Sequence, residues 1–170
     1  LCQWGRALGA KVIGTVSSPE KAEVARAAGC DYPDVRSEKK FSEVVREVTN
    51  GEGCPVVYEA IGKETIQESL DCLRPMGICA AYGHVSGPPE PIDVIKDLGQ
   101  RGSLFITRPA IMHYVAKRAD LEFTANGLFN AISSGILNAN INYEYPLKEA
   151  VKAHEAIESG KTIGATVLLP

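Results

Sequence analysis

Short apolar runs alternate with longer amphipathic stretches along most of this chain. The apolar runs lack the polar alternation of a half-exposed sheet and predict parallel strands buried on both faces; they cover residues 11–17, 55–62, 78–87 and 103–109. The amphipathic stretches predict helices over residues 1–8, 19–29, 37–51 and 63–77. Because strands and helices alternate, and because crossovers between parallel strands are right-handed, the pattern predicts a doubly wound α/β domain.

Residues suited to helix ends mark two of these helices. Ser18 can cap a helix that has Pro19 at its first position and Gly29 just beyond its end. Gly9 is placed to end the first helix, which starts at Leu1 with no capping residue before it. We therefore expect the chain to begin inside a helix, with a segment missing upstream.

The pattern changes after Tyr114. One or two helices are predicted over 116–135, a short strand or extended link over 142–147, a helix over 148–160 and a final strand over 165–170. These pieces are too few for a hydrophobic core of their own. We expect them to pack against a partner domain outside this chain.

Composition narrows the class of protein. The 170 residues are 45% hydrophobic and 23% charged, with a net charge of −3, which gives no general reason to expect a nucleic-acid or anionic membrane surface. The five cysteines form no C-x-x-C pair, so free thiols in a reducing, cytoplasmic setting are expected and no metal site is predicted. No signal peptide and no apolar run long enough to span a membrane is visible.

Small residues and glycine follow three of the predicted strands, in the stretches TVSS (15–18), EAIG (59–62) and AYGHVSG (81–87). Glycine at a strand end either ends the strand or lets a ligand approach the backbone closely. Parallel strands carry their ligand sites at their carboxyl ends. Three such ends along one edge favour a shared ligand crevice.

Ser17, Ser18 and Lys21 follow the first strand, where dinucleotide-binding folds commonly carry an acidic residue for the ribose hydroxyls. One reading is structural: a serine caps the helix and the lysine is a solvated charge. However, a cation is unfavourable at the positive end of a helix unless an anion lies nearby. Two hydroxyls and an ammonium could hold a phosphate, and no carboxylate at the strand end repels it.

His84 lies in the loop at one predicted strand end. A catalytic role is conceivable there, but no neighbour in the sequence supplies a partner that would orient the ring. The alternative is a polar loop residue close to the ligand. His113 and His154 fall in helical surroundings and are interpreted as structural.

Five stretches together resemble the quinone oxidoreductases (zeta-crystallin-like) of the zinc-free medium-chain dehydrogenase/reductase superfamily. They are LCQWGRALGAKVIGTVSSPEKAEVARAAGC, CPVVYEAIGKET, SLDCLRPMGICAAYGHVSG, GSLFITRP and GATVLLP. The resemblance implies a Rossmann-type NADPH-binding domain over residues 1–138 that lacks its first strand and glycine-rich turn. It further implies that residues 139–170 return to a GroES-like catalytic domain, so that the chain is the C-terminal half of such an enzyme.

The resemblance also assigns roles to residues. It implies that Ser17, Ser18 and Lys21 bind the 2′-phosphate of NADPH, with Lys161 reaching a phosphate from the C-terminal segment. Val35 or Arg36 stands where family members often have a tyrosine near the adenine ribose. Ile61 and Gly62 are expected on the adenosine and pyrophosphate side. The residues expected to approach the nicotinamide and its ribose are Gly83, His84, Val85, Ser86, Gly87, Phe105, Thr107 and Arg108.

By the same resemblance, the expected activity is NADPH-dependent reduction of quinones. Reduction of α,β-unsaturated carbonyls is the alternative, and the chain alone could be only a nucleotide-binding or dimer-forming module. Family members dimerise through the strand equivalent to 103–109, so a homodimer is expected. No catalytic residue is assigned, because the family's quinone-side polar residues lie mainly in the half that is missing. Binding of nucleic acid finds no support in a net acidic chain.

Overall fold

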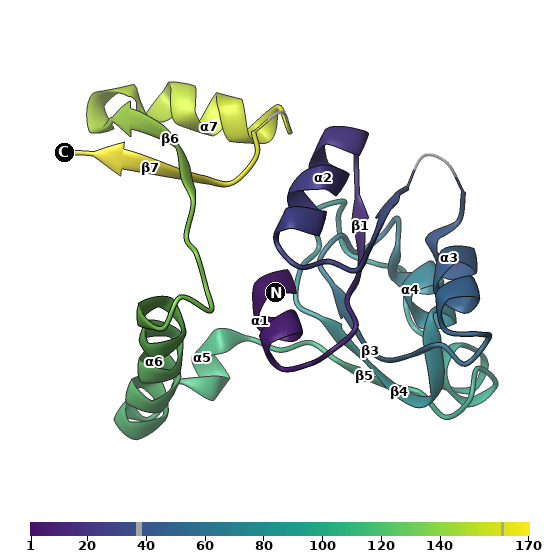
Figure 1. The fold of residues 1–170 in the computed structure, drawn as a ribbon. Helices are drawn as coiled ribbons and strands as arrows, with labels where there is room; N and C mark the ends of the chain where they lie inside the picture. Colours follow the sequence, from purple (N-terminus) through teal and green to yellow (C-terminus); the bar gives the residue numbers. More distant parts are fainter. Residues whose placement is uncertain (37–38, 161) are drawn as a thin grey trace.

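The computed structural model describes residues 1–36, 39–160 and 162–170 (Figure 1). The elements follow the chain in this order: α1 (Cys2–Ala7), β1 (Ile13–Val16), α2 (Pro19–Ala27), β2 (Tyr32–Val35), α3 (Phe41–Val48), β3 (Cys54–Glu59), α4 (Ile66–Asp71), β4 (Leu73–Ala81), η1 (Val94–Gly99), β5 (Phe105–Thr107), α5 (Ile111–Tyr114), α6 (Arg118–Ser133), β6 (Ile141–Pro146), η2 (Leu147–Glu149), α7 (Ala150–Glu158) and β7 (Ala165–Leu169). None of the helices in these ranges is long and apolar enough to cross a membrane.

Every strand pair in the described chain is parallel, as predicted. β1 pairs with β2, and a separate sheet has the order β3-β4-β5. In a doubly wound sheet with strand order 3-2-1-4-5-6, removal of the first strand leaves this division into two and three strands. The α/β fold class is confirmed, and the break in the sheet falls where the first strand was expected to be missing.

Helices cover these sheets and enclose two hydrophobic clusters. α2 packs on β1 and β2, whereas α4 packs on β3 and β4. The larger cluster lies under α4 and consists of Ile66, Leu70, Leu73, Cys79 and Leu104. The smaller one lies under α3 and consists of Phe41, Val45 and Cys72. The core therefore lies mainly between β3 and β4 and the helices α3 and α4.

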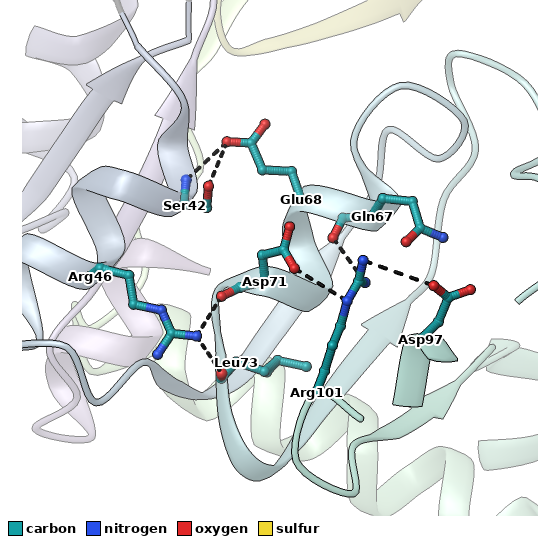
Figure 2. A network of polar contacts seen from close by, with 8 residues as sticks. All are labelled: Ser42, Arg46, Gln67, Glu68, Asp71, Leu73, Asp97 and Arg101. Carbon is teal, nitrogen blue, oxygen red and sulfur yellow. Dashed lines mark hydrogen bonds and ion pairs between the residues drawn. The ribbon is translucent and has the colours of Figure 1, made fainter. Parts of the chain in front are cut away.

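A network of polar contacts fixes the C-terminal end of α4 (Figure 2). Arg46 from α3 donates through Nη2 to the carbonyl oxygens of Asp71, at 2.8 Å, and Leu73, at 3.3 Å. Arg101 pairs through Nε with Asp71 Oδ1 at 3.3 Å and lies 3.9 Å from Asp97 of η1. These contacts satisfy carbonyls that the helix end leaves without partners.

The predicted helix over 63–77 is wrong in its second half. α4 ends at Asp71, and β4 begins at Leu73, which pairs with Cys54. Pro75 explains the early end, because proline and the residue before it disfavour helical backbone. Leu73 is nevertheless buried as the pattern predicted, since both the helix and the strand would turn it toward the core.

The C-terminal elements form a small unit of their own. β6 and β7 pair in parallel, and α7 connects and covers them. In Figure 1 this unit and α6 lie to the left of the body formed by α1 to β5. Lys21 Nζ joins this unit to the body by donating to the Gly160 carbonyl at 2.9 Å. The link between α6 and β6 is joined to the body as well, because the Gln3 side-chain amide exchanges two hydrogen bonds with the Asn138 backbone.

The buried thiols of Cys72 and Cys79 make the stability of the protein depend on pH. Burial raises the pKa of Cys72 from the ordinary 9.0 to about 12 and that of Cys79 to about 11. Below pH 9 both thiols are protonated whether the chain is folded or not. Above it the unfolded chain loses protons that the folded chain keeps, so the free energy of unfolding falls, by about 1 kcal/mol per thiol for each pH unit.

Urea unfolding of the full-length protein between pH 8 and pH 10 measures this decline. The Cys79→Ala variant is the control, and its stability should fall less steeply over the same range. An equal slope for the variant and the parent would contradict the assignment of the decline to this thiol.

Candidate functional site

The loops after β3 and β4 are interlocked at the carboxyl edge of the sheet. Ser86 donates to the Ile61 carbonyl through its backbone amide and through its hydroxyl, each at 2.8 Å. Lys63 N donates to the Gly87 carbonyl at 3.1 Å. These bonds bring together Ile61, Gly62 and residues 83–87, which the resemblance assigns to the cofactor.

Two glycines in these loops are required by this packing. Gly62 has φ +94°, and a Cβ there would lie 2.6 Å from the Gly87 carbonyl oxygen. A Cβ on Gly83 would overlap the backbone of Ala60. The strand-end glycines therefore allow one loop to approach the other, a role that the sequence did not suggest, and close approach of a ligand stays a prediction.

The predicted phosphate cluster lies at the end of β1 and the start of α2. Ser18 is the N-cap, and its hydroxyl accepts from Lys21 N at 3.4 Å. A hydrogen bond with the same hydroxyl lowers the pKa of the Glu20 carboxyl. Ser17 is exposed beside it. Ser18 therefore serves the structural role, while Ser17 and Lys21 remain the phosphate-facing candidates.

Arg36 and the C-terminal segment reach the same end of the sheet. Arg36 N donates to the Val16 carbonyl at 3.1 Å, so the chain after β2 runs beside the end of β1. Lys21 Nζ contacts Gly160, which precedes Lys161. Lys161 itself lies outside the described residues, as do residues 37 and 38. The structure therefore brings the Lys21 side chain to the residue before Lys161 and the backbone of Arg36 to the end of β1.

A cleft of about 300 Å³ opens beside Arg36. It lies between the start of α3 and the start of α4, so it joins the β2 end to the loop after β3. Cations on one side face carboxylates on the other, and the cleft is lined by Arg36, Lys39, Lys40, Phe41, Glu64, Thr65 and Glu68.

His84 has an orienting partner that is distant in the sequence. Arg108 donates through Nη1 to the Tyr82 carbonyl at 2.6 Å, and its Nη2 lies 3.3 Å from His84 Nδ1. Because a guanidinium only donates, Nδ1 is the acceptor in this contact, which turns the Nε2 side of the ring away from Arg108. The sequence missed this pair because Arg108 follows a different strand, and only the pairing of β4 with β5 makes the two neighbours.

The remaining predicted residues lie around this pair. Thr107 pairs with Ala80 in the register of β4 and β5, and Phe105 pairs with Ile78. Phe105 and Thr107 are exposed. Val85 is also exposed, although its backbone amide donates to the Ala60 carbonyl at 3.2 Å. All three are accessible to a ligand at this edge.

The geometry agrees with a family match over much of the chain. Residues 1–118 match the family model described as zinc-binding dehydrogenase. The chain belongs to this family. Despite the family's name, no three His, Cys, Asp or Glu side chains come together as a metal site within the part of the chain that the structure describes.

Curated relatives carry two kinds of name. A 2-haloacrylate reductase of a Burkholderia species is 54% identical over 98% of this chain and 50% of its own length. A quinone oxidoreductase of Pseudomonas aeruginosa is 42% identical over 99% of this chain and 52% of its own length. The predicted resemblance to quinone oxidoreductases is confirmed. The chain spans about half the length of the curated relatives that it matches.

Solved structures agree with these relatives. The quinone oxidoreductase of Escherichia coli, crystallised in complex with NADPH, matches with a TM-score of 0.94 at 39% identity. The match covers 99% of this chain and 52% of that one. The arrangement of strand ends described above is therefore that of an NADPH-binding relative.

Proposed function

We propose that this chain supplies most of the NADPH-binding part of an oxidoreductase that reduces conjugated carbonyl compounds. The observation that carries the proposal is that Ser17, Lys21 and Arg36 follow the carboxyl ends of the paired strands β1 and β2, with a serine where an acid would select NADH. An ammonium, a guanidinium and a hydroxyl suit a 2′-phosphate dianion.

The remaining strand ends would hold the rest of the cofactor. The interlocked loops carrying Ile61, Gly62 and Gly83 provide close backbone approach, and His84, Thr107 and Arg108 lie next along the same edge. NADPH, when bound, supplies a hydride to the acceptor. The chain's own residues bind and orient it, with the contact from Arg108 to His84 Nδ1 fixing the direction of the ring.

Two acceptor classes have support. The quinone oxidoreductases among the relatives favour a quinone, while the 54% identity to a 2-haloacrylate reductase favours an unsaturated acid or another α,β-unsaturated carbonyl. We place quinone reduction first, as the family resemblance implies. Both acceptor classes can take a hydride at a carbon conjugated with a carbonyl.

Turnover of NADPH by the full-length protein, measured with a panel of quinones and a panel of α,β-unsaturated carbonyl compounds, decides between these classes. We expect kcat/KM for 1,4-benzoquinones to exceed that for 2-haloacrylates and unsaturated aldehydes by at least roughly tenfold. A reversed ratio would assign the protein to the second class. No turnover with any acceptor, despite saturable NADPH binding, would leave the chain as a nucleotide-binding module only.

We further propose that two copies associate through β5. This strand is the outer strand of its sheet, so one edge has no partner strand among the described residues. Phe105 on it is 58% exposed. Unpaired edges with apolar side chains promote pairing with another chain.

Light scattering of the cofactor-free full-length protein should give a dimer, and the Phe105→Glu variant should give a monomer. Val24→Glu on α2, also an exposed apolar position, is the matched control and should remain dimeric. A parent protein that is monomeric at high concentration would disprove this interface.

The division into residues 1–138 and 139–170 and the cytoplasmic location are also proposals. β6 and β7 pair only with each other within the described ranges, which supports the division. All five cysteines are free thiols, which supports a reducing compartment.

A further inference from the structure

Glu59, the last residue of β3, is a buried acidic residue that the site described so far does not use. Its side chain and backbone together are only 4% exposed. Carboxylate Oε1 accepts from the backbone amides of Ile61, at 2.6 Å, and Gly62, at 3.0 Å, and from Thr65 Oγ1 at 2.9 Å. Oε2 accepts a hydrogen bond from Ser69 Oγ. Four donors thus converge on one carboxylate.

No cation pairs with Glu59 in the ranges that the structure covers. Burying a carboxylate is costly unless hydrogen bonds replace the water that it loses. An ionised carboxylate accepts at both oxygens and donates at neither, so it can hold four donors at once. The side chain is therefore suited to gather amide and hydroxyl groups, and two of these belong to the loop after β3.

The backbone of Glu59 holds the second loop. Its carbonyl oxygen accepts from the amides of Tyr82, at 2.9 Å, and Gly83, at 3.2 Å. One residue therefore fixes the start of the loop after β4 through its main chain and the loop after β3 through its side chain. Ser86 then joins the two loops farther out, at Ile61.

We propose that Glu59 is a positioning residue that sets the shape of both cofactor-binding loops. This inference rests on the proposed NADPH binding. Because the amides of Ile61 and Gly62 point inward to Glu59, they cannot donate to the cofactor pyrophosphate. The loop then contacts the cofactor through the Ile61 side chain and the surface left open by Gly62.

Three variants of the full-length protein separate the effects of loop shape, of the Glu59 charge and of overall stability on NADPH binding. Glu59→Ala removes the acceptor of both loop amides. Glu59→Gln keeps Oε1 for these amides, while its amide group can donate to Ser69 after the hydroxyl turns. Ser69→Ala is the matched control, because it removes one buried hydrogen bond to the same carboxylate without affecting the loop amides.

Two measurements are made on each variant: hydrogen exchange of the Ile61 and Gly62 amides without cofactor, and the NADPH Kd by fluorescence titration. For Glu59→Ala we expect fast exchange at both amides and a Kd raised about tenfold. For Glu59→Gln we expect slow exchange and a Kd within about threefold of the parent. Ser69→Ala should lower the melting temperature and leave exchange and Kd at the parental values.

Each contrary outcome has a distinct meaning. Parental NADPH affinity in a folded Glu59→Ala variant would overturn the positioning role and leave the proposed function standing. If Glu59→Ala does not fold, parental NADPH affinity in a Glu59→Gln variant whose two loop amides exchange fast would overturn the role instead. Failure of the parent protein to bind NADPH would overturn the proposed function, and the cofactor role of Glu59 with it.

Discussion

Replacing Lys21 with glutamate in the full-length protein is expected to weaken NADPH binding about 100-fold and to leave NADH binding nearly unchanged. A charge-assisted hydrogen bond to phosphate contributes about 1.5–3 kcal/mol, and the new carboxylate adds repulsion to the loss of that bond. About 100-fold in Kd corresponds to roughly 2.7 kcal/mol. NADH lacks the 2′-phosphate, so its affinity should not respond to this position.

The structure shows how Lys21 can serve this role without losing its present contact. An ammonium has three N–H donors, and one of them points to the Gly160 carbonyl at 2.9 Å. Two remain for a phosphate at the exposed end of α2. The contact also fixes the long side chain before the cofactor arrives, which lowers the entropy cost of binding.

Lys11→Glu is the matched control for this variant. Lys11 is exposed and precedes β1, so it lies at the other end of that strand, where it stands over the Tyr32 ring at 5.9 Å. The change in net charge is the same, but no phosphate is expected there. Fluorescence titrations in which NADPH and NADH lose affinity together in Lys21→Glu would refute the phosphate assignment.

Leu70→Ala is expected to lower the free energy of unfolding by about 2–5 kcal/mol. Leu70 is 1% exposed and packs with Ile66, Leu73 and Cys79 between α4 and β4. Removal of its three terminal carbons loses apolar burial and leaves a cavity in a region closed by the polar network around Arg101 and Asp71. The surrounding atoms can relax only in part.

The shift of the urea midpoint of the full-length protein measures this loss. Val94→Ala is the control, since Val94 is 71% exposed on η1 and should change stability by less than about 0.5 kcal/mol. If the two variants unfold at the same midpoint, the cluster beneath α4 does not carry the stability of this region.

Much of the fold could be predicted because it depends on local patterns. Ser18, Pro19 and Gly29 define α2 by chemistry that acts within a few residues, and apolar runs identify the strands. The expectation that both faces of these strands are buried is wrong, because β3 and β5 carry exposed apolar side chains in the described chain. The α4 boundary was wrong because residues 72–74 fit a helical pattern as well as a strand. Pairing of Leu73 with Cys54 decides between the two, and that pairing is not visible in either segment alone.

The sequence predicted which loops meet at the site, but it could not predict which atoms form hydrogen bonds there. Residues 60–62 and 83–87 were expected to lie together because the carboxyl ends of parallel strands meet at one edge of a sheet. It could not show that Arg108 orients His84, since that contact depends on strand order. Glu59 was missed as well, although a charged residue ending an apolar strand was a signal that could have been followed.

The position of the two groups of loops has a consequence for how cofactor preference could change during evolution or engineering. Ser17, Lys21 and Arg36 follow β1 and β2, whereas the loops built around Glu59 and Ser86 follow β3 and β4. The hydrogen bonds of Glu59 and Ser86 described above all lie within the second group of loops and the helix α4. Under the proposed phosphate assignment, substitutions in the first group would change the preference between NADPH and NADH without removing any of these bonds.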